Sequence, residues 1–400
     1  MSRLDDVRTW LTERLPSLLT EHEVPGASVA VLADDEIVEV AGGVLHKHTG
    51  VEVTTDSVFH VGSITKVWTA TLIMQLVDEG RLDLDAPVRT YLPKFRVADE
   101  HASATVTTRH LLNHTAGWEG DIFTPTTSGD DAVERFVDDI MPTVRQTLPP
   151  GEMFSYNNAG FVVLGRIIEV LREKPWAQVL RERLAEPLGL EYVATRADEA
   201  ILFRAAVGHV QADPADEPTP TKVWALPYSN APFGAMLAMS ARDLLGFARL
   251  HLCDGLAPDG TRLLSESAAA EMRAPFAEVP RLTPRPTQRG LGWSRYDWDG
   301  GLVVGHDGQT IGQLAYLRVV PERGVAVAVL TNGGRAGRLH TAVTSEALRV
   351  LAGIAVPPLP GVPPGPVDAV DRPERYVGRY EVHSGRVDVE VDDEGRLWMT

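Results

Sequence analysis

The stretch VFHVGSITKVWTATLIMQLVDEG, residues 58–80, contains the pattern on which the fold depends. Its first five residues, 58–62, are strand-like. From Ser63 to Glu79 the apolar residues then recur at helical spacing, and Gly80 is the expected C-terminal stop. The stretch therefore predicts a short strand followed by a helix that begins at Ser63.

Ser63 and Lys66 lie three residues apart, so the predicted helix places both side chains on one face. A serine hydroxyl is a poor nucleophile at neutral pH, and a partly desolvated lysine with a lowered pKa can act as its base. Free backbone N–H groups at the start of the helix can stabilise an oxyanion. Taken alone, the pattern is weak evidence for a catalytic pair, because an N-cap serine beside a solvated lysine explains it better.

Strands are predicted on both sides of this stretch, towards the two ends of the chain. An N-terminal helix is followed by a hairpin that turns at Asp34-Asp35, and three further strands precede a last helix. The order predicts an α+β fold, in which one antiparallel sheet is flanked by helices and accompanied by a mostly helical subdomain. The predicted strands are 27–33, 37–43, 302–305, 313–320 and 325–331, and the predicted helices are 7–19, 132–140, 159–172, 176–184, 241–251 and 339–351.

Closely spaced prolines in residues 357–370 predict an extended linker after a main domain of residues 1–356. Residues 371–400 contain three short strand-like runs, which are too few to bury a core of their own. Either these strands pack against the main domain, or they begin a larger β-rich domain.

The composition excludes several classes of function. A formal charge of -17 without basic runs argues against nucleic acid and anionic membranes as partners. No apolar run is long enough to span a membrane, and the N-terminal residues lack a signal-peptide pattern, so the sequence favours the cytoplasm. His101, His110 and His114 lack metal-site spacing, and neither a metal nor a cofactor is expected.

Tyr156-Asn157-Asn158 forms a polar turn before the predicted helix 159–172. A tyrosine close to Ser63 and Lys66 can relay a proton to a leaving group if nearby cations lower its pKa from about 10. Asn158 can hold Lys66 or a substrate carbonyl. Read alone, Tyr156 fits a core residue and Asn158 a helix cap.

His306-Asp307-Gly308-Gln309 is expected to end the strand 302–305. Gly308 allows close approach of a substrate to the backbone, and the N–H of Gln309 can face an oxyanion. Read alone, these residues fit a turn glycine beside a surface histidine.

Together and in this order, the three motifs resemble those of the penicillin-recognising serine enzymes: class C β-lactamases, DD-peptidases, D-aminopeptidases and related esterases. The resemblance covers roughly residues 25–351, and its supporting segments are 111–117, 154–164 and 232–236. Histidine at position 306, where the β-lactamases have lysine, favours the peptidases and esterases over strong β-lactamase activity.

The resemblance implies a role for each motif residue. Ser63 corresponds to the nucleophile, Lys66 to its base, and Tyr156 to the acid/base partner. Asn158, His306 and Gly308 correspond to substrate-positioning residues. The backbone N–H groups of Ser63 and Gln309 correspond to the oxyanion hole.

The sequence leaves three functions open for a small-molecule or peptidyl acyl substrate. The acyl-enzyme can be resolved by water, as in an ester or amide hydrolase. It can be resolved by an amine, as in the penicillin-binding-protein-type thioesterases of peptide biosynthesis, which the chain also resembles. Those enzymes add a lipocalin-like domain, and residues 371–400 would be the start of such a domain. A silent peptide or β-lactam sensor is the third possibility. The sequence does not predict the oligomeric state.

Overall fold

The computed structural model describes residues 2–213, 216–279, 287–358, 370–382 and 385–399. Most of the predicted linker, residues 359–369, therefore lies outside the described residues, as do 383–384 and 400 at the predicted C-terminal strands.

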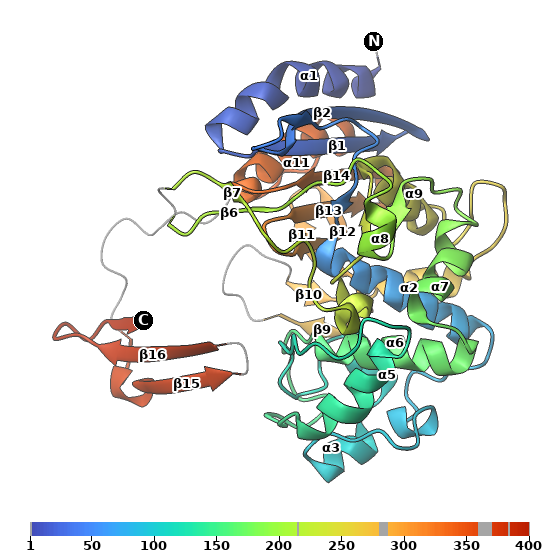
Figure 1. Cartoon of the computed structure of the whole chain (residues 1–400), viewed down its shortest axis with the longest axis vertical. Helices are drawn as coiled ribbons and strands as arrows, with labels where there is room; N and C mark the ends of the chain where they lie inside the picture. Colours follow the sequence, from blue (N-terminus) through green and yellow to red (C-terminus); the bar gives the residue numbers. More distant parts are fainter. Residues whose placement is uncertain (1, 214–215, 280–286, 359–369, 383–384, 400) are drawn as a thin grey trace.

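A large antiparallel sheet joins strands from both ends of the chain, as the sequence predicts (Figure 1). Its strand order is β3-β2-β1-β14-β13-β12-β11-β10-β9. The hairpin of β1 and β2 turns at Asp34 and Asp35, both of which have positive φ, and β1 then pairs with β14. The strands are β1 (Gly26–Ala33), β2 (Glu36–His46), β3 (Val51–Glu52), β9 (Ala277–Glu278), β10 (Gln288–Arg289), β11 (Ser294–Trp298), β12 (Gly301–Gln309), β13 (Leu314–Val320) and β14 (Val325–Thr331).

Helices cover both faces of this sheet and bury a separate apolar core on each. On one face, α1 (Arg3–Glu21) and α11 (Ala336–Ala352) pack together against valines of β1 and β14. On the other face, α2 (Thr65–Asp78) and α9 (Ala241–Leu252) belong to a larger core. α2 contacts α6, so this core continues into the helical region.

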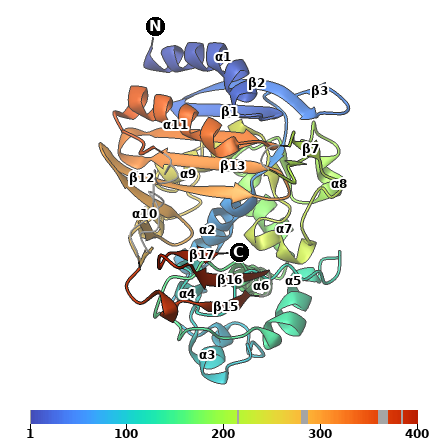
Figure 2. The same ribbon diagram turned by 90° about the vertical axis from the view of Figure 1, so that its left-hand side faces the viewer.

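The helical region lies at the opposite end of the molecule from α1 (Figures 1 and 2). Its helix α6 (Ala159–Arg172) matches the predicted bounds, whereas the predicted helices 132–140 and 176–184 each end in a π-helical turn. The other helical segments are α3 (Glu100–Thr105), α4 (Thr108–Leu112), α5 (Ala132–Arg135), α7 (Trp176–Leu180), α8 (Ala197–Ala200) and α10 (Glu266–Arg273).

Small sheets complete the structure. One contains β4 (Phe59–His60), β5 (Val193–Ala194) and β8 (Ala238–Met239), and another contains β6 (His209–Val210) and β7 (Thr219–Pro220). The C-terminal sheet, formed by β15 (Gly378–Val382), β16 (Gly385–Val391) and β17 (Leu397–Met399), is drawn beside the main body in Figure 1. The domain boundary at residue 356 stays a prediction.

Two local predictions were wrong. The helix does not begin at Ser63, because Gly62–Ile64 forms a 3-10 turn and α2 begins at Thr65. The strand predicted to end at Gly305 continues to Gln309, because β13 pairs with it from Val304 to Gln309.

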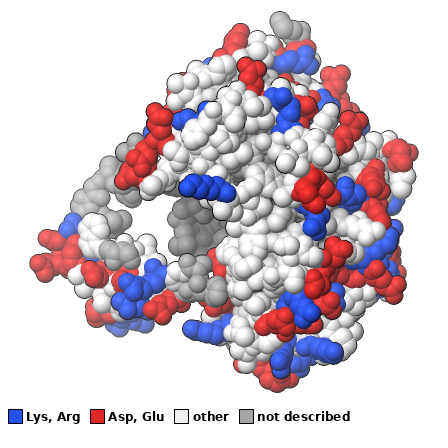
Figure 3. Space-filling model, in the orientation of Figure 1, with Lys and Arg blue, Asp and Glu red and all other residues white. Residues whose placement is uncertain are grey.

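No helix within the described ranges combines the length and apolar composition needed to cross a bilayer. On the face seen in Figure 3, acidic and basic side chains are interspersed.

Candidate active site

Ser63 lies in the 3-10 turn between β4 and α2, where two glycines bring other backbone segments against it. Gly62 has a φ of 50°, and a Cβ there would lie 2.5 Å from the backbone N of Gln309. At Gly234, a Cβ would lie 2.9 Å from the backbone N of Ser63. The two amides predicted to form the oxyanion hole therefore lie in one neighbourhood around this turn.

Lys66, in the first turn of α2, points at the Ser63 hydroxyl. Its Nζ donates to Ser63 Oγ at 2.8 Å and to the backbone oxygen of Phe233 at 3.0 Å. The side chain is fully buried, while Ser63 is partly exposed. Burial lowers the pKa of the Lys66 amine well below its ordinary value, and the Arg289 charge lowers this pKa further against the opposing effect of Asp121. This shift favours the neutral amine, which can accept a proton.

Tyr156 lies immediately before α6 and is hydrogen-bonded to Ser63. Lys66 Nζ lies 5.0 Å from the centroid of the Tyr156 ring, and His114 stacks on this ring at 4.5 Å. Burial raises the pKa of Tyr156 to about 12, although Arg289 and the hydrogen bond to Ser63 act in the opposite direction. The phenol is therefore protonated at neutral pH and can donate a proton.

The two asparagines after Tyr156 differ in their contacts. The Asn157 side chain is structural, because its oxygen accepts from Gly160 N at 2.8 Å and its nitrogen donates to Trp118 O at 2.8 Å. Asn158 Nδ2 donates to Asp121 Oδ1 at 2.7 Å, and its buried Oδ1 has no partner within the described part of the chain. Asn158, rather than Asn157, thus has an acceptor available to a ligand.

The third motif lies on β12 beyond the last residue paired with β11. That pairing ends at Gly305, whereas the pairing with β13 continues to Gln309. A Cβ on Gly308 would lie 1.9 Å from the backbone oxygen of Val61, so only glycine allows this contact. The His306 ring centroid lies 6.2 Å from that of Tyr156. β12 therefore lies against the Ser63 turn through residues 306–309.

His306 is buried and uncharged. Its Nδ1 lies 2.6 Å from the backbone oxygen of Asp307, and its Nε2 has no partner among the described residues. Burial, together with the charge of Arg289, lowers its pKa well below the ordinary value. Asp307 points to another partner, because its carboxylate forms an ion pair with Arg318 at 2.6 Å.

Two charged neighbours of the motifs were missed in the sequence. Asp121 contacts Asn158, and the Arg289 guanidinium carbon lies 5.5 Å from the centroid of the Tyr156 ring. Asp121 lies in a loop and Arg289 on a two-residue strand, without regular spacing to any motif. No signal in the sequence therefore identifies them.

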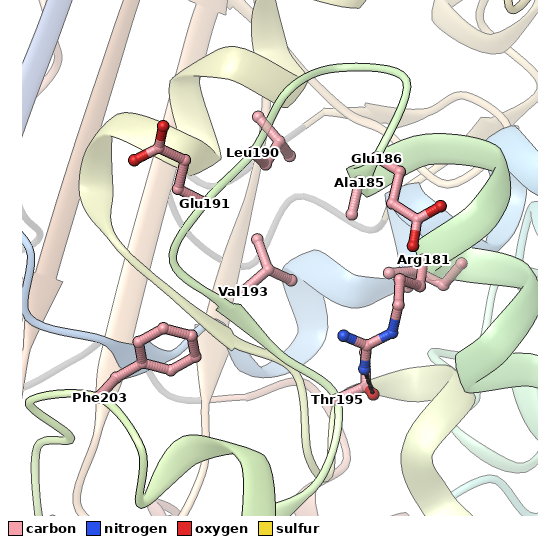
Figure 4. A pocket seen from close by; sticks show the side chains of 9 residues that line it. Arg181, Ala185, Glu186, Leu190, Glu191, Val193, Thr195 and Phe203 are labelled. Carbon is pink, nitrogen blue, oxygen red and sulfur yellow. Dashed lines mark hydrogen bonds between the residues drawn. The ribbon is translucent and has the colours of Figure 1, made fainter.

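A separate cavity of about 160 Å³ lies in the helical region and contains none of the motif residues (Figure 4). Arg181 on its wall donates to Thr195 Oγ1 at 3.2 Å and forms an ion pair with Glu199. Within the described ranges, no three His, Cys, Asp or Glu side chains are grouped as metal ligands.

Comparison with known proteins agrees with this arrangement. The family model described as "Beta-lactamase" matches residues 11–350. "Penicillin-binding protein 4" of Amycolatopsis lactamdurans is 47% identical over 377 residues, which cover 93% of this chain and 97% of that protein.

Two solved structures show the same fold. The structure of SurE with D-Leu has a TM-score of 0.76 at 30% identity, and the match covers 99% of this chain and 87% of that one. The D-amino acid amidase of Ochrobactrum anthropi SV3, complexed with L-phenylalanine amide, has a TM-score of 0.70 at 26% identity and covers 86% and 97%, respectively. The chain therefore belongs to the Beta-lactamase family and is a serine hydrolase or acyltransferase of that superfamily.

Proposed function

We propose that the chain hydrolyses an ester or amide of a small or peptidic acyl substrate through a covalent ester on Ser63. The observation that carries this proposal is the buried Lys66 amine, which lies 2.8 Å from Ser63 Oγ. A base that is neutral and in hydrogen-bond contact with the hydroxyl meets both requirements for activating a serine.

In the proposed acylation, Lys66 takes the hydroxyl proton while Ser63 Oγ bonds to the substrate carbonyl carbon. The amides of Ser63 and Gln309 stabilise the oxyanion. The bond to the leaving group then breaks as Tyr156 donates its proton to that group, and the Lys66 ammonium returns a proton to Tyr156. Water repeats the sequence in reverse to release the acid.

Unpartnered buried polar atoms support a polar, extended acyl substrate. Asn158 Oδ1 and His306 Nε2 have no partners among the described residues, and buried polar groups in that state are costly unless a ligand or water satisfies them. The edge of β12 beyond Gly305 adds backbone groups on the side from which β11 is absent. A peptide segment lying along this edge satisfies both features.

We further propose a D-configured residue at the acyl carbonyl. This part rests on the likeness to the solved structures, one of which is a D-amino acid amidase and another of which contains D-Leu. The cytoplasmic location favoured by the sequence is part of the same proposal and fits an intracellular peptidic substrate.

A second candidate is transfer of the acyl group to an amine. The C-terminal strands β15–β17 support it, because the penicillin-binding-protein-type thioesterases that the sequence resembles add a β-rich domain after the catalytic one. D-Leu also carries an amine that can act as an acyl acceptor. Water and amine then compete for the same ester on Ser63.

A paired substrate panel tests these proposals. It contains D- and L-leucyl 4-nitroanilides, short aryl esters, nitrocefin and a peptidyl thioester, each with and without added D-Leu as acceptor. We expect D-leucyl turnover to exceed L-leucyl turnover at least roughly ten-fold, with free acid as the main product. Amide product as the main species supports the second candidate. Equal turnover by Ser63→Ala contradicts both, and failure of a fluorophosphonate to label the native chain favours the silent sensor.

A further inference from the structure

Arg289 lies on the short strand β10, beside the aromatic residues that precede α6. Its guanidinium carbon is 5.4 Å from the centroid of the Phe154 ring and 5.5 Å from that of Tyr156. Nη1 donates to Ser294 Oγ on β11. The side chain is thus held against the face of the Tyr156 ring.

Within the described part of the chain, this guanidinium forms no ion pair with a carboxylate. Burial lowers the Arg289 pKa, and among the described residues Asp307 is the one carboxylate that opposes this effect; Asp307 is itself ion-paired with Arg318 at 2.6 Å. Arg289 Nε is buried and has no hydrogen-bond partner within the same ranges. Burying a charge without a counter-ion is costly, so we expect the Arg289 charge to have a role at this site.

The other charged and titratable groups around Tyr156 do not supply a permanent positive charge. Burial lowers the pKa values of Lys66, His114 and His306 well below their ordinary values, which disfavours the charged form of each group. Asp121 and Asp307 both oppose ionisation of the Tyr156 phenol, whereas Arg289 favours it.

We propose that Arg289 is a positioning residue that stabilises the Tyr156 phenolate formed when this phenol protonates the leaving group. The inference rests on the proposed function, in which Tyr156 is the acid. In the step concerned, the bond between the acyl carbon and the leaving group breaks, and the leaving group takes the phenol proton. The O–H electron pair stays on Tyr156 beside the Arg289 charge until the Lys66 ammonium reprotonates it. No further reactant is consumed.

Leaving-group dependence tests this inference. Two esters with the same uncharged acyl group are compared, a 4-nitrophenyl ester and an ethyl ester. Nitrophenolate leaves without a proton, whereas ethoxide requires one. We expect Arg289→Met to lower kcat/KM for the ethyl ester roughly ten- to one-hundred-fold, and for the nitrophenyl ester less than about three-fold. Arg289→Lys, which keeps the charge, is expected to restore most of the loss.

Controls separate this role from a structural one. Arg295→Met removes an arginine from the adjacent strand, where it donates to Arg273 O, and we expect no change in leaving-group dependence. If Arg289→Met does not fold, Arg289→Gln is measured instead. An equal loss of kcat/KM for both esters overturns the proposal. If further substrates that bear a carboxylate are the only ones affected, the proposal is also overturned, because Arg289 would then belong to an anion-binding site.

Tyr156→Phe distinguishes failure of the inference from failure of the proposed function. If Tyr156→Phe discriminates between the esters and Arg289→Met does not, only the role of Arg289 is overturned. If neither variant discriminates, the acid role of Tyr156 fails as well.

Discussion

At the scale of single residues, the proposed chemistry depends on a buried lysine that has no counter-ion in hydrogen-bond contact among the described residues. Lys66 Nζ contacts Ser63 Oγ and the backbone oxygen of Phe233, and its desolvation favours the uncharged amine. A neutral amine has a free electron pair for the serine proton, which a solvated lysine at neutral pH does not. The same burial that is costly for a charge thus suits Lys66 to its proposed role as the base.

Substitutions of Lys66 distinguish a need for a proton acceptor at this position from a need for a positive charge. Lys66→Arg keeps a cation that cannot lose its proton, and Lys66→Met keeps the length without either property. We expect both variants to lose kcat/KM by at least roughly 10³-fold, measured with a 4-nitrophenyl ester. Substantial activity in Lys66→Arg would show that the site needs a positive charge rather than a base.

The pH profile follows from the direction of the Lys66 pKa. Because this pKa is lowered, the neutral form persists below the ordinary range of lysine. We expect kcat/KM to be level through neutral pH and to fall only on the acidic side, where the amine becomes protonated. An activity that rises only near the ordinary lysine pKa, about 10.4, would contradict the assignment.

Gly308 tests how closely β12 must approach the Ser63 turn. An added Cβ would lie 1.9 Å from Val61 O, so Gly308→Ala must displace either the strand or the turn. We expect a loss of turnover of at least roughly 100-fold with a folded chain, because displacements of about 1 Å at a reacting centre have that effect. Gly337→Ala in α11, where the nearest contact is an ordinary 3.5 Å, is the control and should keep full activity.

At the scale of elements, the candidate site lies where β12 extends beyond the end of the neighbouring strand β11. The pairing of β12 with β11 ends at Gly305, whereas the pairing of β12 with β13 continues to Gln309. The turn before α2 lies against residues 306–309 of β12. The sequence predicts β1, β14 and α6 well because their apolar patterns are long. It does not predict β9 and β10, which have two residues each and depend on their neighbours in the sheet.

The junction between α6 and α7 contains a buried carboxylate with a testable effect on stability. Glu169 accepts from Trp176 N at 3.1 Å and from Arg166 at 3.2 Å, and burial raises its pKa to about 7. A carboxyl with a raised folded-state pKa binds its proton more tightly when folded. Stability from this group is therefore complete below the unfolded value near 4.5 and is lost as the pH rises towards 7.

Glu169→Gln should remove this dependence. We expect the free energy of unfolding of the wild type, relative to Glu169→Gln, to decrease by about 1–3 kcal/mol between pH 4.5 and pH 8, measured by urea denaturation. A constant difference across this range would show that Glu169 titrates normally.

At the scale of the whole molecule, the main body and the C-terminal sheet differ in how they bury apolar surface. The body has a core on each face of its sheet, whereas Tyr380, Trp398 and Met399 are 51%, 55% and 78% exposed. The packing contacts of β15–β17 are chiefly with one another. The C-terminal sheet therefore contributes little to the stability of the body.

Truncation after residue 356 measures this contribution. We expect the shortened chain to keep its fluorophosphonate labelling and to unfold within about 3 °C of the full chain, since little shared surface is lost. A large fall in the unfolding temperature would mean that the sheet packs on the body, the alternative left open by the sequence.

The sequence and the structure contribute different parts of the site. Ser63, in the 3-10 turn, and Lys66, in the first turn of α2, are three residues apart, so their contact was predictable from spacing. Tyr156 and His306 could be joined to them only through the family resemblance, because they lie far away in the chain. Asp121 and Arg289 approach the site through loop and edge-strand packing, which no local pattern encodes.

Mass spectrometry of the acyl-enzyme is the most direct measurement of the central claim. The full chain is mixed with a slowly released acyl ester, quenched in acid and digested. The account predicts an added mass equal to the acyl group on the peptide that contains Ser63, and no adduct on Ser63→Ala. An adduct on another residue, or turnover by Ser63→Ala at the wild-type rate, would contradict it.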